Sequence, residues 1–375
     1  MAERTSEFRP LLKWPGGKTR EWKRLAPHLP TRVRHFVDPF MGGLAPFALC
    51  PFEGRAFLND RHERLVELHR LVQAQDGALF RELDGLAHDW DALEAVSQQV
   101  RDAFRIEIEA GRAGGEVDHE HLADRVALPE LTRRSADDRT AHEFVVASLA
   151  NKALRVPRLE RRHGVRFDAD ALDEHAETAV RAGYYTLIRA HEYGCEGAAR
   201  CADFLFVREY CYGSMFRQGR DGRFNIPYGG RSYNAKPFAR RVAQLRSPAT
   251  VAHLSRATFH QGDFETFLDT VAPELGSDDF VFADPPYDSE FSTYGTNLFT
   301  LDDHRRLAAA LARSSAPWLL VIKDTEDVRR TYLSDEVLAA GGRLAETFGK
   351  RYGYNVRGRN ERRTSHLVVV GPGRG

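Results

Sequence analysis

The feature that most constrains the fold is a short apolar run that leads into an acidic residue and two glycines. Val33–Val37 reads as a buried strand, Asp38-Pro39-Phe40-Met41-Gly42-Gly43 follows, and Leu44–Leu49 continues as an apolar, helix-like run. A strand, a glycine turn and a helix open a doubly wound α/β sheet, in which glycine lets the backbone approach a ligand and the acid accepts a ligand hydroxyl or amine. This pattern predicts an α/β protein that binds an adenosine-containing cofactor.

A second acidic position follows the next strand-like run. Arg55–Leu58 leads into Asn59 and Asp60, which is where doubly wound sheets place the carboxylate that grips a ribose. Upstream, Gly17-Lys18-Thr19 invites comparison with a phosphate-binding loop. The first glycine of that motif would fall at Leu12, so the nucleotide-hydrolase interpretation is rejected.

A third strand-like run ends in a tetrapeptide that suits a flat, amine-bearing ring. Phe280–Ala283 precedes Asp284-Pro285-Pro286-Tyr287. The Asp284 carboxylate and the Pro285 carbonyl can accept hydrogen bonds from an NH2 group, while Tyr287 can stack on the ring. Ligands of open α/β sheets bind at the carboxyl ends of strands. Taken alone, the tetrapeptide is equally well explained as a Pro-Pro turn capped by Asp284 and packed by Tyr287.

Several ordered segments together resemble one family, the Dam-type (D12 class, alpha group) N6-adenine-specific DNA methyltransferases. The matching segments are Lys13-Trp14-Pro15-Gly16-Gly17-Lys18, the loop Asp38–Gly42, Asp60, Gly222–Gly229, Asp284–Tyr287 and the stretch Phe291–Leu301. The resemblance covers roughly residues 11–72 and 203–333. It implies a Rossmann-like S-adenosylmethionine-dependent methyltransferase sheet with a helical target-recognition insertion.

The resemblance also implies a role for each matched residue. S-adenosylmethionine is expected to bind Trp14, Lys18, Asp38, Phe40, Gly42, Asp60, Asp263 and Asp284. The catalytic residues are expected to be Asp284, Pro285, Pro286 and Tyr287, acting on an adenine swung out of double-stranded DNA. DNA contacts are expected from Arg217, Arg220, Arg223 and Asn225, although Asn225 suits fixing the hairpin better than reading a base. For Asp263, a helix cap before Phe264–Leu268 is an equally open interpretation; for Arg217, guanine reading and phosphate contact both stay open.

Two positions depart from the family pattern. Leu44 stands where the family usually has glycine or a small residue, which could tighten or reshape the cofactor pocket. Gly213 replaces an asparagine of the base-reading hairpin, while Arg217 keeps its arginine. The DNA sequence that this chain reads is therefore not predicted.

Charge is balanced overall but locally uneven. The chain of 375 residues has 54 basic and 54 acidic side chains, which argues against capture of nucleic acid by gross charge. Basic residues concentrate in three segments, residues 217–241, 350–363 and 155–166. A solvated charged face explains any one such cluster; three of them, one inside a matched motif, favour a nucleic-acid groove.

Cysteine usage and hydropathy indicate a cytoplasmic protein without a structural metal. Cys50, Cys195, Cys201 and Cys211 form no Cys-x-x-Cys pair, so buried thiols are expected and zinc is not. Residues 1–10 are polar and the longest apolar runs are too short to span a bilayer. The expected partners are duplex DNA and, where one exists, a cognate restriction or defence component.

The length fits one large and one smaller domain. Residues 1–72 and 203–375 are predicted to form a discontinuous catalytic domain around a helical insertion, 73–202. Helices are expected over 93–108, 141–154 (ended at Arg155-Val156-Pro157) and 171–190; further strands over 204–207, 257–260, 318–322, 343–348 and 366–370, the last two as a hairpin.

Other functions stay open. The acceptor could be adenine in RNA or cytosine N4, although Asp rather than Ser at 284 favours adenine and the hairpin match favours DNA. The chain could be a non-catalytic DNA-binding or interaction protein on a methyltransferase scaffold. A protein-amide methyltransferase would be expected to carry Asn at 284.

Overall fold

The computed structural model describes residues 8–230, 236–286, 299–351 and 363–372. The chain forms two compact units, which we call the sheet unit and the helical unit. The sheet unit comprises Met1–Gln73, Arg217–Gly222 and Ser247–Gly375, and the helical unit comprises Ala74–Phe216 and Arg223–Arg246. The chain thus leaves the sheet near the expected residue 72, whereas it returns for good only at Ser247, well after the expected residue 203.

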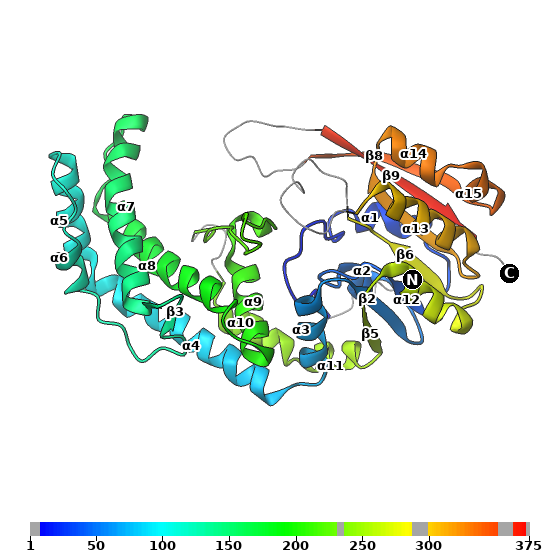
Figure 1. Ribbon diagram of the computed structural model, residues 1–375, viewed down its shortest axis with the longest axis horizontal. Helices are drawn as coiled ribbons and strands as arrows, with labels where there is room; N and C mark the ends of the chain where they lie inside the picture. The colour runs from blue at the N-terminus through cyan, green and yellow to red at the C-terminus, as the bar shows by residue number, and fades with distance from the viewer. Residues whose placement is uncertain (1–7, 231–235, 287–298, 352–362, 373–375) are drawn as a thin grey trace. The chain divides into compact units, whose positions relative to one another are not determined.

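The sheet unit is built on a mostly parallel, seven-stranded sheet, as the sequence predicts (Figure 1). The strand order is β5-β2-β1-β6-β7-β9-β8. Their bounds are β1 Phe36–Asp38, β2 Ala56–Asp60, β5 Ala257–Gln261, β6 Phe280–Ala283, β7 Trp318–Lys323, β8 Arg343–Arg351 and β9 Arg363–Gly371. β5, β2, β1, β6 and β7 are parallel neighbours, whereas β9 is antiparallel to both β7 and β8. The expected terminal hairpin is confirmed.

The order in which the chain adds strands to the sheet reverses at β1, and this reversal determines where a ligand can bind. Phe36 pairs with Ala56 of β2 on one side and with Phe280 of β6 on the other. The chain progresses outward from β1 to β2 and β5, and later from β6 to β7. β1 and β6 therefore flank the topological switch point, at whose carboxyl edge open α/β sheets bind their ligands.

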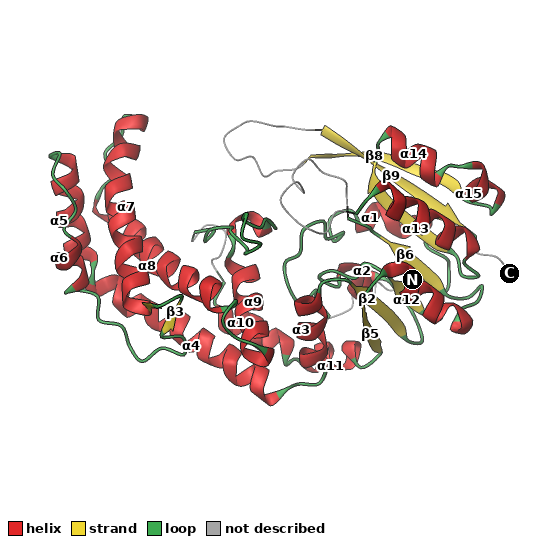
Figure 2. Ribbon diagram, viewed as in Figure 1, coloured by secondary structure: helices red, strands yellow, loops and turns green. Residues whose placement is uncertain are grey.

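Helices cover both faces of the sheet (Figure 2). On one face α12 Phe264–Val271, α13 Leu301–Arg313, α14 Glu326–Tyr332 and α15 Asp335–Ala339 bury a core with Val37, Val281 and Leu320. On the other face, Phe36 stacks on Phe52 and Trp22 packs against Phe282. The helices of this layer are α1 Trp22–Leu25, α2 Ala45–Leu49 and α3 Glu63–Gln73. The sheet unit also contains η1 Ala26–His28, η4 Ala272–Glu274 and α11 Pro248–Leu254. Alternate side chains of buried parallel strands thus point into separate layers.

The helical unit contains seven α-helices among its described residues. They are α4 Gly77–Gln99, α5 Arg101–Arg112, α6 His119–Ala123, α7 Ala141–His163, α8 Ala169–His191, α9 Gly197–Tyr210 and α10 Phe238–Leu245, with the two-stranded ribbon β3 Ser135–Ala136 and β4 Arg139–Thr140 and the turn η2 Tyr212–Ser214. Trp90 stacks on Tyr210 and meets the edge of Phe206. These aromatic rings join α4 to α9 in the core of the unit.

Three expectations for this unit are wrong in detail. The run 204–207 lies inside α9 rather than in a strand, because a short apolar run has no period that separates a buried helix from a strand. Helix α7 continues through Pro157 to His163; Pro157 and its neighbour Val156 are buried, and packing outweighs the local preference against a proline in a helix. The helix expected over 93–108 is two helices that meet at Val100.

No helix within the described ranges is long and apolar enough to cross a membrane.

Candidate active site

Lys18 and Asp284 form an ion pair at the carboxyl end of β6. The Lys18 side chain is 1% exposed, and its Nζ donates to the Asp284 carboxylate and to the Gly16 carbonyl, the latter at 2.7 Å. Pro285 is buried and Pro286 exposed, while Tyr287 lies outside the described residues. The N-terminal segment, 266 residues away in sequence, thus reaches the tetrapeptide. The sequence grouped Lys18 with the cofactor residues and missed this contact.

Asp38 ends β1 as a fully buried carboxylate. Its Oδ1 accepts the Phe40 amide at 3.0 Å, and its Oδ2 is buried with no hydrogen-bond partner among the described residues. Burial raises the pKa of Asp38 well above the usual carboxyl range; Asp284 and Asp60 add to the increase, while the Phe40 amide and Lys18 oppose it. Asp60, Asp284 and Lys18 therefore lie within electrostatic reach of Asp38.

Asp60 holds the glycine loop in place. Its Oδ2 accepts the Gly42 amide at 3.1 Å and its Oδ1 accepts the His62 amide at 2.9 Å. Burial raises the pKa of Asp60, and these amide hydrogen bonds oppose the increase. Asp60 thus has a structural task in addition to the expected contact with a ribose.

Trp14 packs directly on this loop. A Cβ added to Gly42, where φ is +45°, would come within 2.7 Å of the Trp14 ring, and one added to Gly43 within 2.9 Å of Trp14 Cβ. The ring also meets His62 edge-on at 5.5 Å. Glycine is therefore required here by close approach of Trp14, and by a left-handed backbone at Gly42.

Leu44 adopts the left-handed backbone conformation that glycine favours. Its φ is +69° and its side chain is fully buried. A non-glycine residue in this conformation carries strain of about 1–3 kcal/mol. Leu44 therefore keeps the backbone conformation of the loop that leads into α2 while adding a buried side chain.

Two residues that the sequence did not single out brace the loops. His69 Nε2 donates to the Gly42 carbonyl at 2.9 Å; burial lowers the pKa of His69 to about 4, which keeps the ring neutral. Asn59 Nδ2 donates to Pro39 O at 3.1 Å and to Gly262 O at 3.2 Å. Asn59 thus joins the loop after β1 to the turn after β5. The apolar neighbours of Asn59 in β2 gave no signal for this role.

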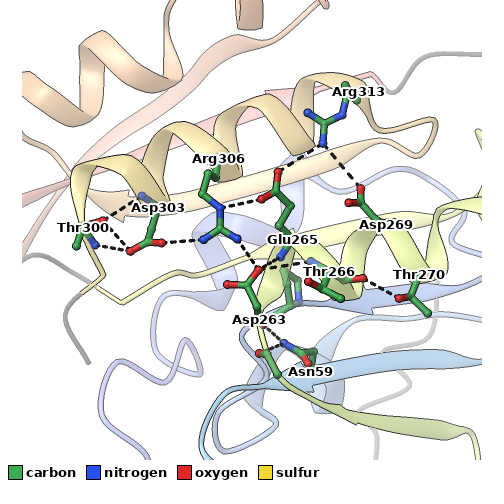
Figure 3. Close-up of polar contacts among 12 residues, drawn as sticks. Asn59, Asp263, Glu265, Thr266, Asp269, Thr270, Thr300, Asp303, Arg306 and Arg313 are labelled. Carbon is green, nitrogen blue, oxygen red and sulfur yellow. Dashed lines mark hydrogen bonds and ion pairs between the residues drawn. The ribbon is translucent and has the colours of Figure 1, made fainter. Parts of the chain in front are cut away.

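Asp263 caps α12 (Figure 3). Its Oδ1 accepts the amides of Glu265 and Thr266 and the Arg306 guanidinium, the latter at 2.6 Å. Arg306 also donates to Glu265 and Asp303. The helix-cap interpretation is confirmed, and Arg306 joins α13 to the cap.

Phe40 lies beside this network. Its half-buried ring packs at 5.4 Å from Phe264 and 5.6 Å from Phe299. The loop after β1 is therefore anchored to α12 by an aromatic contact.

The residues expected to contact DNA are divided between the two units. Arg217 and Arg220 are exposed in the segment assigned to the sheet unit, whereas Arg223 and Asn225 belong to the helical unit. Arg223 donates to Asp137 at 2.8 Å and lies over the Tyr193 ring. Asn225 is half-buried between the buried side chains of Phe224 and Ile226. Arg223 and Asn225 are thus held in their own unit.

One group of side chains in the described part of the chain has donor atoms close enough for a metal ion, namely His191, Cys195 and Asp203. Asp203 is buried and already paired with Arg133, whose Nε donates to it at 3.0 Å, and with His191 at 2.6 Å. Burial, with Asp203 nearby, raises the pKa of the Cys195 thiol to about 12. These contacts explain the group as a polar network around a buried carboxylate.

Comparison with known proteins identifies the family. The sequence model of the D12 class N6 adenine-specific DNA methyltransferases matches residues 14–104 and 159–343. The chain is 24% identical to the Type II methyltransferase M.CviBI of Paramecium bursaria Chlorella virus NC1A over 96% of this chain and 99% of that protein. It is 29% identical to the DNA adenine methylase of Vibrio cholerae serotype O1 over 86% and 84% of the two chains. It is also 34% identical to the Retron Ec67 DNA adenine methylase of Escherichia coli, over 40% of this chain and 50% of that one.

The matched range contains the glycine loop, the carboxylates at the ends of β1 and β2, and the Asp284 tetrapeptide. The sheet that carries them has the mixed α/β architecture of a Rossmann-like methyltransferase. The chain belongs to the D12 class of N6-adenine-specific DNA methyltransferases, enzymes that methylate the N6 amine of adenine in DNA with S-adenosylmethionine as the methyl donor.

Proposed function

We propose that the carboxyl ends of β1 and β6 form one catalytic site, with the methyl donor held at β1 and the target adenine at β6. The observation that supports this most is the position of Asp38 and Asp284 after two paired strands, with the buried Lys18 ion-paired to Asp284. The two strands are hydrogen-bonded neighbours at the switch point of the sheet. A donor and an acceptor held by these two ends would be close enough for direct transfer.

The residues at the end of β1 fit S-adenosylmethionine. Asp38 Oδ2 is a buried oxygen in need of a donor, and the ammonium group of the methionine part would supply one. A cation there would also offset the burial that raises the pKa of Asp38. Gly42, held by Asp60 and packed under Trp14, keeps the loop after β1 close to the end of the strand. When bound, the cofactor supplies an electrophilic methyl group.

The residues at the end of β6 fit the adenine amine. The Asp284 carboxylate and the Pro285 carbonyl accept its two N–H groups, which directs the nitrogen lone pair toward the methyl carbon. Bound S-adenosylmethionine would supply the methyl group to this nitrogen and keep the electron pair of the broken S–C bond on its sulfur, and the methylated amine would release one proton to solvent. The amine is neutral beforehand, so Asp284 does not have to deprotonate it first. Tyr287 would stack on the ring.

DNA recognition completes the proposal. The amine of a stacked adenine is out of reach, so we infer that the base is flipped out of the duplex. We assign backbone and base contacts to Arg217, Arg220, Arg223 and Asn225, and target recognition to the helical unit. Because M.CviBI is a Type II methyltransferase, a cognate restriction or other defence component in the cytoplasm is the further partner that we infer.

Product analysis tests the site and the acceptor together. Purified protein is incubated with labelled S-adenosylmethionine and either duplex DNA, RNA or protein, and the methylated products are identified by mass spectrometry. We expect N6-methyladenine from duplex DNA, with a rise in 2-aminopurine fluorescence when this analogue replaces the target adenine. N4-methylcytosine, methylated RNA or methylated protein would support the rival acceptors. Cofactor binding without any transfer would support a degenerate, DNA-binding scaffold.

A further inference from the structure

The C-terminal half of α7 carries a row of arginines that are not balanced by acidic side chains. Arg155, Arg158, Arg161 and Arg162 are exposed, and none of them forms an ion pair within the described ranges of the chain. Successive residues of a helix are about 100° apart. Arg155, Arg158 and Arg162 therefore project from one narrow strip of α7.

The opposite strip of the same helix is buried. Val156, Pro157 and Glu160 face the rest of the unit, where α7 packs on α5, α6 and α8. Figure 1 shows α5, α6 and α7 together at one end of the helical unit, with α9 and α10 at the other. The arginine strip is thus held on a packed helix rather than on a loose segment.

Three other arginines that lie near α7 in the same unit are paired with acidic side chains. Arg112 binds Glu160 and Glu109, Arg166 binds Glu109, and Arg105 binds Asp173. Glu160, the acidic residue within the C-terminal half of α7, is buried and committed to Arg112. The positive charge of the strip therefore has no local counterpart.

The electrostatic surroundings agree with this excess. Burial lowers the pKa of Lys152, one turn before Arg155, and repulsion by Arg155 lowers it further. Burial, with repulsion by Lys152, lowers the pKa of His175 on α8 to about 4, while Glu160 opposes the decrease. The helix dipole explains basic residues in the last turn, such as Arg161 and Arg162, but its effect fades within one turn and does not reach Arg155 or Arg158.

We infer that this strip, Arg155, Arg158 and Arg162, is a second binding site for duplex DNA, one that contacts phosphates and reads no sequence. From Arg155 to Arg162 the helix rises by about 10 Å, which matches about three phosphate-to-phosphate steps of one strand at roughly 3.4 Å each along the duplex axis. The strip adds affinity for any sequence, and base reading stays with the residues assigned above. This inference rests on the proposed function, since the DNA substrate is the polyanion that it binds.

The test measures binding of fluorescein-labelled 30-base-pair duplexes of mixed sequence to the full-length protein over a range of salt concentrations. The variant carries Arg155→Gln, Arg158→Gln and Arg162→Gln, which keep helix propensity. We expect weaker binding to every duplex and a salt dependence, the slope of log K against log salt, that falls by about 3. The charge-matched control carries Arg305→Gln, Arg313→Gln and Arg330→Gln, exposed arginines that are paired with acidic side chains in the sheet unit. The control should keep the wild-type slope.

A third protein separates charge from folding. Lysine at the same positions (Arg155→Lys, Arg158→Lys and Arg162→Lys) should restore the affinity and the slope, because a phosphate contact needs only a positive charge. An unchanged slope in the glutamine variant, an equal loss in the control, or no rescue by lysine would overturn the inference. Failure of the proposed function looks different, because none of the proteins would then form N6-methyladenine at saturating DNA.

Discussion

The Lys18 ammonium is buried against the Asp284 carboxylate, which joins the N-terminal Lys13–Lys18 segment to the tetrapeptide after β6. Its Nζ also binds the Gly16 carbonyl, so the lysine fixes the carboxylate from one side. We propose that Lys18 acts as a positioning residue.

Lys18→Met should therefore impair transfer more than cofactor binding. Without the ammonium, the Asp284 carboxylate loses its ion-pair partner and its orientation. We expect kcat to fall at least about tenfold, a loss of ~1.4 kcal/mol in the transition state, and unfolding to become easier by about 3 kcal/mol. Steady-state kinetics and urea unfolding measure these effects. The control is Lys23→Gln, on the exposed side of α1; wild-type kcat in Lys18→Met would refute the positioning role.

Cofactor binding should depend on the ionisation of Asp38. Because burial raises the pKa of Asp38 above that of the unfolded chain, the group favours folding most below the ordinary carboxyl pKa, and this contribution is lost as pH rises through the raised pKa. A cofactor ammonium needs the ionised form. Affinity should therefore increase with pH over the same window, and binding should release protons.

Calorimetry in buffers of different ionisation enthalpy counts those protons. Asp38→Asn should abolish the release and weaken S-adenosylmethionine binding, whereas Asp269→Asn, an exposed carboxylate of α12, should leave both unchanged. Proton release that persists in Asp38→Asn would assign the linkage to another group.

Because the backbone of Leu44 is left-handed, we expect Leu44→Gly to be more stable than Leu44→Ala, the reverse of the usual order for a buried position. Leu44→Ala removes a fully buried side chain and keeps the backbone strain, at a cost of about 2–5 kcal/mol. Leu44→Gly removes more atoms, yet relieves the backbone strain of about 1–3 kcal/mol. The glycine variant should thus be the more stable of the two in chemical unfolding, with both below the wild type. A more stable alanine variant would show that φ at this position is negative.

Two substitutions at Asp263 distinguish its role as the cap of α12 from the expected contact with the cofactor. Asp263→Ala should lower stability by about 1 kcal/mol through loss of the cap, whereas Asp263→Ser keeps a capping oxygen and loses the carboxylate that Arg306 binds. If Asp263 also contacts the cofactor, both variants bind S-adenosylmethionine more weakly. Normal binding by the serine variant would limit Asp263 to the cap.

The sequence predicts the sheet better than the helical unit for a physical reason. Each parallel strand near the switch point is a short apolar run followed by an acid and a turn, as at Asp38 and Asp284. The local sequence therefore shows both where the strand lies and where its carboxyl end is. The run 204–207 is marked only by its apolar residues, which do not distinguish a helix from a strand. Its helical conformation depends on the contacts of α9 with α4 and α8. Pro157 is tolerated for the same reason.

In the candidate site, too, the local sequence predicts some features and misses others. The carboxylates at strand ends could be predicted because the sheet brings their positions together. The partners of those carboxylates could not, since Lys18 meets Asp284, and Arg306 meets Asp263, through side chains distant in sequence. His69 and Asn59 brace backbone carbonyls, and no local pattern marks such contacts.

We proposed that the end of β1 holds the methyl donor and the end of β6 holds the adenine. Methyl transfer and cofactor binding, both measured in Asp284→Ala, test this division most directly. We expect transfer to duplex DNA to be abolished while the dissociation constant for S-adenosylmethionine stays close to the wild-type value. Transfer at the wild-type rate would contradict it.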